Sequence, residues 1–202
     1  MSDKYKESLA NVDGTHTPMT EEGQNDTPIV LSKYKVLFAD LDGTLIDTAS
    51  GKLFAEDPTD FRIKKDVLDV IREKMPNVEF VCVCSNQGGI PQYMTEEEFE
   101  TKMLAVNAFI TRYCSKGVIY EYCASLDKDN PYRKPNTGML SKLLNKINAM
   151  MEDCNEPLFS KSDCVMIGDA SGKEGDFSDS DKRTAENFGI DYIDVLDFVE
   201  CT

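Results

Sequence analysis

The sequence lacks long hydrophobic runs and zinc-binding cysteine or histidine pairs. No apolar run among its 202 residues is longer than a strand, whereas a membrane-spanning helix needs about twenty apolar residues. The N-terminal stretch MSDKYKESLANVDG also lacks the hydrophobic segment of a secretory signal. The seven cysteines include no CxxC pair, and the only histidine is His16, which argues against a structural zinc site. We therefore expect no membrane contact, and an intracellular protein of the nucleus or cytoplasm whose cysteines stay reduced.

Positive charge is also scarce. The chain has 22 Lys and Arg against 37 Asp and Glu, which gives a formal net charge of −15. Proteins that follow a long duplex through its phosphates need a basic surface, so only a short contact with a nucleic-acid end remains compatible with this charge. An anionic substrate would need a metal ion or a few local cations. The sequence contains no GxxxxGK[ST] loop, so we expect no ATP-binding kinase domain.

Apolar runs and helical patterns alternate along most of the chain. Residues 1–32 are polar and lack apolar periodicity, so we predict a disordered tail followed by one domain at 33–202. The predicted strands are 35–39, 78–84, 118–123, 164–167 and 192–195, and the predicted helices are 63–75, 96–113, 137–151 and 179–188. Strands that alternate with helices indicate a parallel sheet with helices on both faces. The predicted fold class is therefore α/β, a three-layer α/β/α Rossmann-like arrangement.

Two carboxylates follow the first predicted strand, in the sequence VLFADLDGTL. Asp40 and Asp42 are separated by one residue, so in an extended chain their side chains point the same way. Ligands of open parallel sheets bind at the carboxyl ends of the strands. Gly43 allows the chain to turn away at that point. The pair could end a strand at a solvated edge, or it could hold something positive.

Other predicted strand ends bring further polar groups to the same edge. The second strand ends in Ser85-Asn86-Gln87 and two glycines, a turn that suits a phosphate. The fourth ends in Asp169, and a loop with Asp176, Asp179 and Asp181 follows; Arg133 and Lys134 precede a predicted helix. Taken singly, each has a structural explanation: an ordinary loop, a solvated acidic helix start, or a surface lysine. Taken together, carboxylates at two strand ends suit Mg²⁺, and a carboxylate pair suits nucleophilic attack on phosphorus with acid/base assistance.

These residues resemble the four motifs of the haloacid dehalogenase superfamily. The resemblance implies little or no cap domain, Asp40 as nucleophile, Asp42 as acid/base, and Ser85 and Lys134 as phosphoryl-binding catalytic residues. It also implies a Mg²⁺ site at Asp40, Asp42 and Asp169, with Asp181 as the second acid of the fourth motif and Asp176 as a weaker candidate. The predicted substrate-binding residues are Gly43, Thr44, Asn86, Gln87, Arg133 and Lys173.

A narrower resemblance extends beyond the site. SGKLFAEDPTDFRI, VCSNQGGI, YRKPNTGM, GDASGK and DFSDSDKRTAENFGI are similar to segments of the 3′-phosphatase domain of polynucleotide kinase 3′-phosphatases. This resemblance implies a Mg²⁺-dependent phosphatase that removes 3′-phosphates from DNA strand-break ends in DNA repair. We expect a monomer that makes a short single-strand contact, with Phe54, Phe61 or Tyr93 available to stack on a base.

Two alternatives remain open. A small-molecule phosphatase acting on histidinol phosphate or a heptose bisphosphate would share the four motifs, although many such relatives carry a Cys/His zinc loop that is not evident here. A non-catalytic receiver-like module also gathers acids, a hydroxyl and a lysine around Mg²⁺, but its phosphate-accepting aspartate usually lies on the third strand.

Overall fold

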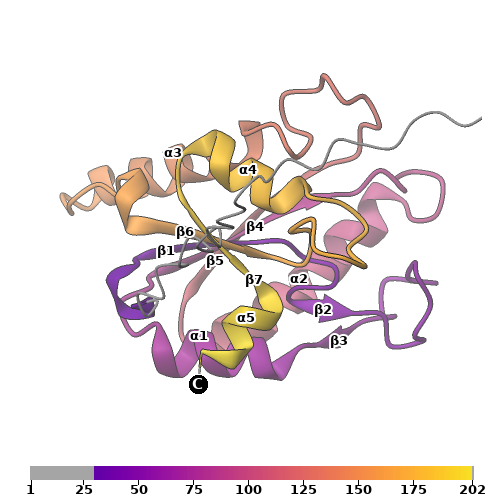
Figure 1. Ribbon diagram of the computed structural model, residues 1–202, viewed down its shortest axis with the longest axis horizontal. Helices are drawn as coiled ribbons and strands as arrows, with labels where there is room; N and C mark the ends of the chain where they lie inside the picture. Colours follow the sequence, from indigo (N-terminus) through magenta and orange to yellow (C-terminus); the bar gives the residue numbers. More distant parts are fainter. Residues whose placement is uncertain (1–29, 202) are drawn as a thin grey trace, which may run out of the picture.

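The computed structural model describes residues 30–201, and its central feature is a parallel sheet (Figure 1). In this part of the chain five strands form the sheet, in the order β5 (Gly117–Cys123), β4 (Phe80–Asn86), β1 (Val36–Ala39), β6 (Cys164–Gly168) and β7 (Asp191–Asp194). Each neighbouring pair is parallel. The central strand β1 is completely buried, as expected for a strand covered on both faces. The predicted α/β fold class is confirmed.

Helices cover both faces of the sheet and make two separate cores. Helices α1 (Lys65–Lys74), α2 (Glu96–Cys114) and α5 (Val195–Glu200) lie on one face, and α3 (Gly138–Asp153) and α4 (Ser180–Phe188) lie on the other (Figure 1). Alternate residues of β1 belong to opposite cores: Leu37 packs toward the first face, and Phe38 packs toward the second. This alternation follows from the two-residue period of a strand.

A hairpin and a short C-terminal helix are among the elements that were not predicted from the sequence. A hairpin of β2 (Ile46–Asp47) and β3 (Arg62–Ile63) lies between β1 and α1, and its strands enclose the loop 48–61. Two-residue strands are too short to show a period. The six-residue helix α5 was also missed, because it is too short to show a helical period, and its first residue, Val195, was assigned to the last strand. A capping box begins α2, because the side chains of Thr95 and Glu98 each accept a hydrogen bond from the other residue's backbone N–H.

Residues just before the predicted domain boundary contribute to the described core. Residues 1–29 of the predicted tail lie outside the described residues, but Leu31 is buried in a 3-10 helix, Leu31–Lys33. Tyr34 is also buried, and its hydroxyl donates a hydrogen bond to Asp191, 2.6 Å away. Within residues 30–201, no helix combines the length and apolar character needed to cross a bilayer.

Candidate active site

The nucleophile candidate, Asp40, lies directly after β1 and is only 8% exposed. Its backbone N–H bonds the carbonyl of Ile167, so the neighbouring strand β6 fixes the backbone here. Its Oδ1 accepts a hydrogen bond from the ammonium of Lys134. Burial raises the pKa of Asp40 well above its ordinary value, the charge of Lys134 opposes the rise, and the charge of Asp181 adds to it. Asp40 thus depends on Lys134 for its charge balance.

Lys134 is buried between two carboxylates. Its ammonium contacts Asp40 and lies 2.7 Å from Oδ1 of Asp181. Burial alone would lower the pKa of Lys134, but the charges of Asp181 and Asp40 outweigh it and raise the pKa. Asn86, at the end of β4, holds the Lys134 backbone: its side chain accepts from Lys134 N–H at 2.9 Å and donates to the Lys134 carbonyl at 3.1 Å. Asn86 therefore anchors the loop that delivers the lysine.

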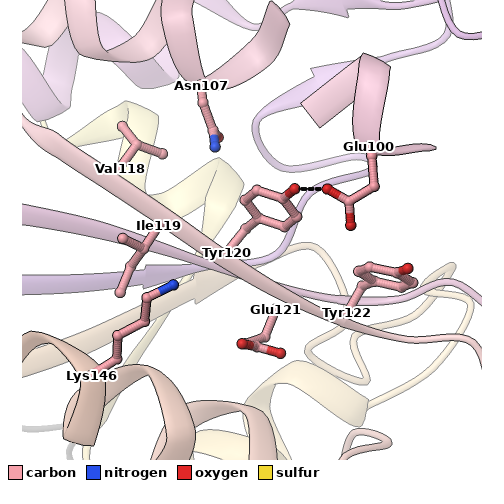
Figure 2. A pocket seen from close by; sticks show the side chains of 8 residues that line it. All are labelled: Glu100, Asn107, Val118, Ile119, Tyr120, Glu121, Tyr122 and Lys146. Carbon is pink, nitrogen blue, oxygen red and sulfur yellow. Dashed lines mark hydrogen bonds between the residues drawn. The ribbon is translucent and has the colours of Figure 1, made fainter. Parts of the chain in front are cut away.

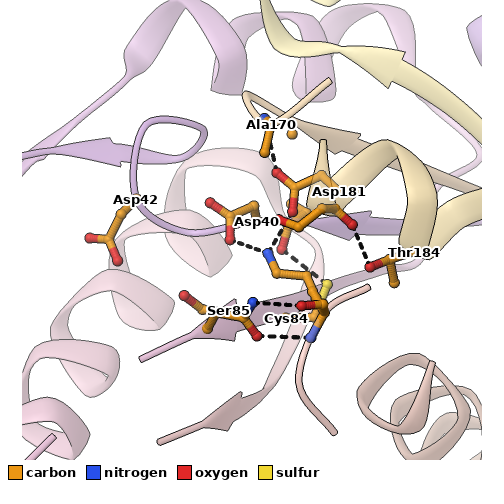
Figure 3. A network of polar contacts seen from close by, with 12 residues as sticks. Asp40, Asp42, Cys84, Ser85, Ala170, Asp181 and Thr184 are labelled. Carbon is orange, nitrogen blue, oxygen red and sulfur yellow. Dashed lines mark hydrogen bonds and ion pairs between the residues drawn. The ribbon is translucent and has the colours of Figure 1, made fainter. Parts of the chain in front are cut away.

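Two glycines make room for the acids of the fourth motif. A Cβ at Gly168 would lie 2.3 Å from Oδ2 of Asp181, and a Cβ at Gly43 would lie 2.0 Å from Oδ2 of Asp169. Gly43 also has a φ of +81°, which few other residues adopt. Asp181, in the first turn of α4, is 1% exposed and accepts from the N–H of Ala170 at 3.2 Å (Figure 3). Any side chain at either glycine would displace a carboxylate.

Asp40, Asp169 and Asp181 form a three-carboxylate cluster. One oxygen of each lies within 4.8 Å of the others. Burial and the charge of Asp181 raise the pKa of Asp169 to about 6. Oδ1 of Asp181 has its ion pair to Lys134 but no hydrogen bond of proper geometry, and the buried hydroxyl of Thr44 has no partner in residues 30–201. Three carboxylates that repel one another, with oxygen atoms free to act as metal ligands, fit a hard divalent cation such as Mg²⁺.

Asp42 is placed apart from this cluster. Figure 3 shows its carboxylate at a distance from Asp40 and Asp181, and its side chain is 51% exposed. The side-chain amide of Gln87 donates to Oδ2 of Asp42 at 2.7 Å and contacts the hydroxyl of Ser85 at 2.8 Å. The side chain of Asp42 is therefore linked through Gln87 to Ser85, the predicted phosphoryl-binding residue, and does not belong to the three-carboxylate cluster.

Three other predicted residues have partners outside the cluster. Asp176 accepts hydrogen bonds from the backbone N–H groups of Lys173 and Ser171, which lower its pKa and shape the loop after β6. The Lys173 ammonium pairs with Asp194 and Asp197 at 3.2 and 2.9 Å. The guanidinium of Arg133, in turn, donates to the carbonyl of Ser125 at 2.7 Å. Of the two candidates for the second acid, the structure therefore places Asp181 in the cluster and gives Asp176 a loop-building role.

Two lysines near the site were missed by the sequence reasoning. Lys102 of α2 lies 3.1 Å from Oδ1 of Asp42, and Lys64 donates to the carbonyl of Gly43 at 2.6 Å. A weak signal for Lys102 existed, because it follows Phe99 by three residues and so shares the apolar face of its helix.

Two cavities lie away from the three-carboxylate cluster of Asp40, Asp169 and Asp181. One of about 330 Å³ is lined by the edge strand β5 and by residues of α2 and α3 (Figure 2). Within it Tyr120 donates a hydrogen bond to Glu100. The other, of about 490 Å³, lies beside the start of α3. Neither cavity is lined by Lys134 or by an acid of the three-carboxylate cluster. The site is therefore identified by the chemistry of that cluster and not by the size of a cavity.

Comparison with known families agrees with this geometry. The family described as Polynucleotide kinase 3 phosphatase matches residues 35–196, which include every acid and lysine of the cluster. The chain belongs to this family. The resemblance to the 3′-phosphatase family and to the haloacid dehalogenase superfamily is therefore confirmed.

Members and neighbours of the family differ in their named functions. The bifunctional polynucleotide phosphatase/kinase of Schizosaccharomyces pombe is 32% identical over 164 residues, 80% of this chain and 37% of that protein. The histidine biosynthesis bifunctional protein HisB of Actinobacillus pleuropneumoniae is 27% identical over 159 residues, 76% of this chain and 38% of that protein. The chain thus spans less than two fifths of either curated relative.

A solved structure shares the fold. The D,D-heptose 1,7-bisphosphate phosphatase from B. bronchiseptica, complexed with magnesium and phosphate, aligns with a TM-score of 0.51 and 15% identity, covering 82% of this chain and 96% of that one. At this identity the likeness concerns the fold alone.

Proposed function

We propose that this protein is a Mg²⁺-dependent polynucleotide 3′-phosphatase that removes 3′-phosphates from DNA strand-break ends in DNA repair. The main supporting observation is the buried Asp40 with Lys134 against it, inside a segment that matches the 3′-phosphatase family. A buried carboxylate held by one cation, at the carboxyl end of a parallel strand, is a suitable nucleophile for phosphorus.

The first half-reaction transfers the phosphoryl group to the protein. A carboxylate oxygen of Asp40 forms a bond to phosphorus while the bond from phosphorus to the 3′-oxygen breaks. The carboxyl of Asp42 gives its proton to that leaving oxygen. Ser85 and Lys134 hold phosphoryl oxygens during the transfer. The products are an aspartyl-phosphate at Asp40 and a free 3′-hydroxyl.

The second half-reaction clears the intermediate. The carboxylate of Asp42, now without its proton, takes one from water, and the water oxygen attacks phosphorus. The bond from Asp40 to phosphorus breaks, which restores the Asp40 carboxylate and releases inorganic phosphate. Asp42 ends with its proton returned, so the cycle consumes one water for each phosphate.

Asp40, Asp169 and Asp181 would hold the metal ion. When bound, Mg²⁺ would screen the negative charge that carboxylate and phosphate bring together. These proposed metal ligands differ in one residue from the ligands expected from the motifs, because the side chain of Asp42 lies outside the three-carboxylate cluster.

A pair of exposed aromatic side chains, in the loops that follow β2 and β4, offers a surface for a nucleobase. Phe54, in the loop 48–61, stacks on Tyr93, which follows β4, with ring centroids 5.5 Å apart and planes 7° from parallel. Both are more than half exposed, whereas Phe61 packs against the core. A flat, solvent-accessible pair supports a contact with one or two bases and is compatible with a net charge of −15.

The test compares phosphate release from matched oligonucleotides that carry a 3′- or a 5′-phosphate. We expect Mg²⁺-dependent release from the 3′ end, loss of release on addition of EDTA, and little release from the 5′ end. The Asp40→Asn variant should lose turnover, because an amide is a poor nucleophile toward phosphorus. Full activity of that variant would refute the assignment of the nucleophile.

A small-molecule phosphatase is the second candidate function. Similarity to HisB and to a heptose bisphosphate phosphatase favours it. The same assay, extended to histidinol phosphate and heptose bisphosphate, separates the two candidates. A strong preference for either small molecule over the 3′-phosphorylated oligonucleotide would replace the first proposal. A phospho-aspartate that survived for hours without hydrolysis would instead indicate a receiver-like module.

A further inference from the structure

Lys102 is a buried cation on the apolar face of a helix. It is 3% exposed and lies on α2 among the buried residues Phe99, Met103 and Val106. Lysine is seldom fully buried unless its charge has a partner. The stem of Lys102 therefore fills core space, and the position of its ammonium needs a specific explanation.

The partner of this ammonium is Asp42. The Nζ atom of Lys102 lies 3.1 Å from Oδ1 of Asp42, and within residues 30–201 it has no other hydrogen-bond or ion-pair partner. Gln87 donates to the other oxygen, Oδ2, at 2.7 Å and contacts the Ser85 hydroxyl. The two oxygens of Asp42 are thus distinguished: Oδ1 is directed to the buried lysine, and Oδ2 lies toward the phosphoryl-binding residue.

We propose that Lys102 is a positioning residue for Asp42. By binding Oδ1 it fixes the carboxyl so that Oδ2, which Gln87 links to Ser85, is the oxygen that gives a proton to the leaving group and later takes one from water. The inference rests on the proposed phosphatase chemistry, but it does not require that the substrate be a polynucleotide. Lys102 touches no reacting atom in this scheme and acts through Asp42.

This role predicts a dependence on the leaving group. An alkoxide such as the 3′-oxygen of a nucleotide must be protonated as it leaves, whereas 2,4-dinitrophenolate leaves without a proton. In Lys102→Met, release of phosphate from a 3′-phosphorylated oligonucleotide or from glycerol 3-phosphate should fall about 10²-fold, within the range expected for general acid catalysis. Formation of dinitrophenolate in the first turnover should be almost unchanged, because this leaving group needs no general acid.

The second half-reaction gives an independent readout. Hydrolysis of the aspartyl-phosphate needs Asp42 as base, whatever the leaving group. With 2,4-dinitrophenyl phosphate, Lys102→Met should therefore release one equivalent of dinitrophenolate rapidly and then turn over slowly. A loss of packing alone would slow both steps and would show no such burst.

Control variants distinguish the effect of the Lys102 charge from that of losing any lysine or of misfolding. Lys146→Met, which removes an exposed lysine of α3, should leave both esters unaffected. Lys102→Arg keeps the charge and should recover part of the alkyl-ester rate. Asp42 is half exposed, so water can still reach its carboxylate when the ammonium is absent. Circular dichroism confirms that each variant is folded, and Lys102→Gln replaces Lys102→Met if the latter is not.

A double-mutant cycle with Asp42→Asn completes the test. If Lys102 acts through Asp42, then Lys102→Met should have no further effect in the Asp42→Asn background. Equal losses with alkyl and dinitrophenyl esters, or an additive loss in the double variant, would overturn the proposal. Hydrolysis of glycerol 3-phosphate but not of the oligonucleotide would overturn only the proposed substrate, and a wild-type protein inactive on all three esters would overturn both proposals.

Discussion

Removing the ammonium of Lys134 should destabilise the protein severely, because it balances two buried carboxylates. Lys134 is 4% exposed, and its partners Asp40 and Asp181 are 8% and 1% exposed. Lys134→Met keeps most of the side-chain volume and removes only the charge. The variant leaves two carboxylates facing each other with little access to water.

The size of the effect follows from this burial. Breaking a buried ion pair by removing one partner costs about 3–5 kcal/mol, because an uncompensated charge remains. Since Lys134 has two partners, we expect the free energy of unfolding to fall by about 5 kcal/mol. That is a large part of the stability of a typical domain.

The measurement is urea unfolding of the metal-free protein at pH 7, followed by circular dichroism. The matched control is Lys142→Met, which breaks an ion pair with Glu121 at 2.8 Å whose lysine side chain is 53% exposed. Exposed pairs contribute about 0–1 kcal/mol, so the control should lose little. Adding Asp181→Asn to Lys134→Met should restore part of the stability by removing one of the two buried charges.

Similar losses in Lys134→Met and Lys142→Met would refute the reasoning, since they would show that Asp40 and Asp181 do not need the lysine charge. A double variant less stable than Lys134→Met alone would also contradict it. Such a result would mean that the two carboxylates are neutral in the folded protein or are better solvated than their exposure indicates.

Two further predictions concern Asp169. Gly43→Ala would place a Cβ 2.0 Å from Oδ2 of Asp169. Because a misplaced catalytic group can lower a rate about 10²-fold, kcat should fall by that order while circular dichroism shows a folded protein. An unchanged kcat would contradict this prediction. Burial and the charge of Asp181 raise the pKa of Asp169 from 3.8 to about 6. The folded protein therefore binds the proton of Asp169 more tightly than the unfolded chain does. The free energy of unfolding should fall as pH rises through that range. In EDTA, Asp169→Asn should therefore gain stability relative to wild type between pH 4 and 6, and a constant difference between the two would argue against the shift.

The alternation of strands and helices was predictable because it depends on local periodicity. Within residues 30–201, the five strands of the main sheet and four of the five α-helices were anticipated within a few residues. What escaped were the two-residue strands of the hairpin and the six-residue helix at the C-terminal end, which are too short for a period to be visible.

The neighbourhood of the acids was predictable for a related reason. The carboxyl ends of parallel strands meet at one edge, so Asp40 and Asp169 could be expected together although 129 positions separate them. The choice between Asp176 and Asp181 could not be made in this way. It depends on which acid enters the space that Gly168 leaves open and which one is bound by backbone N–H groups of its own loop.

The sequence by itself determined the order of the elements, the parallel sheet, and the position of a carboxylate pair where its central strand ends. Only the tertiary structure decided which charges are buried and which partners they have. Lys173 was predicted to bind substrate and Lys102 was not singled out, yet the ammonium of Lys102 is buried against Asp42, whereas that of Lys173 lies at the surface between Asp194 and Asp197. The physical reason is that burial and charge pairing are set by residues from separate elements, 60 positions apart for Lys102 and Asp42, whereas periodicity reports only on neighbours along the chain.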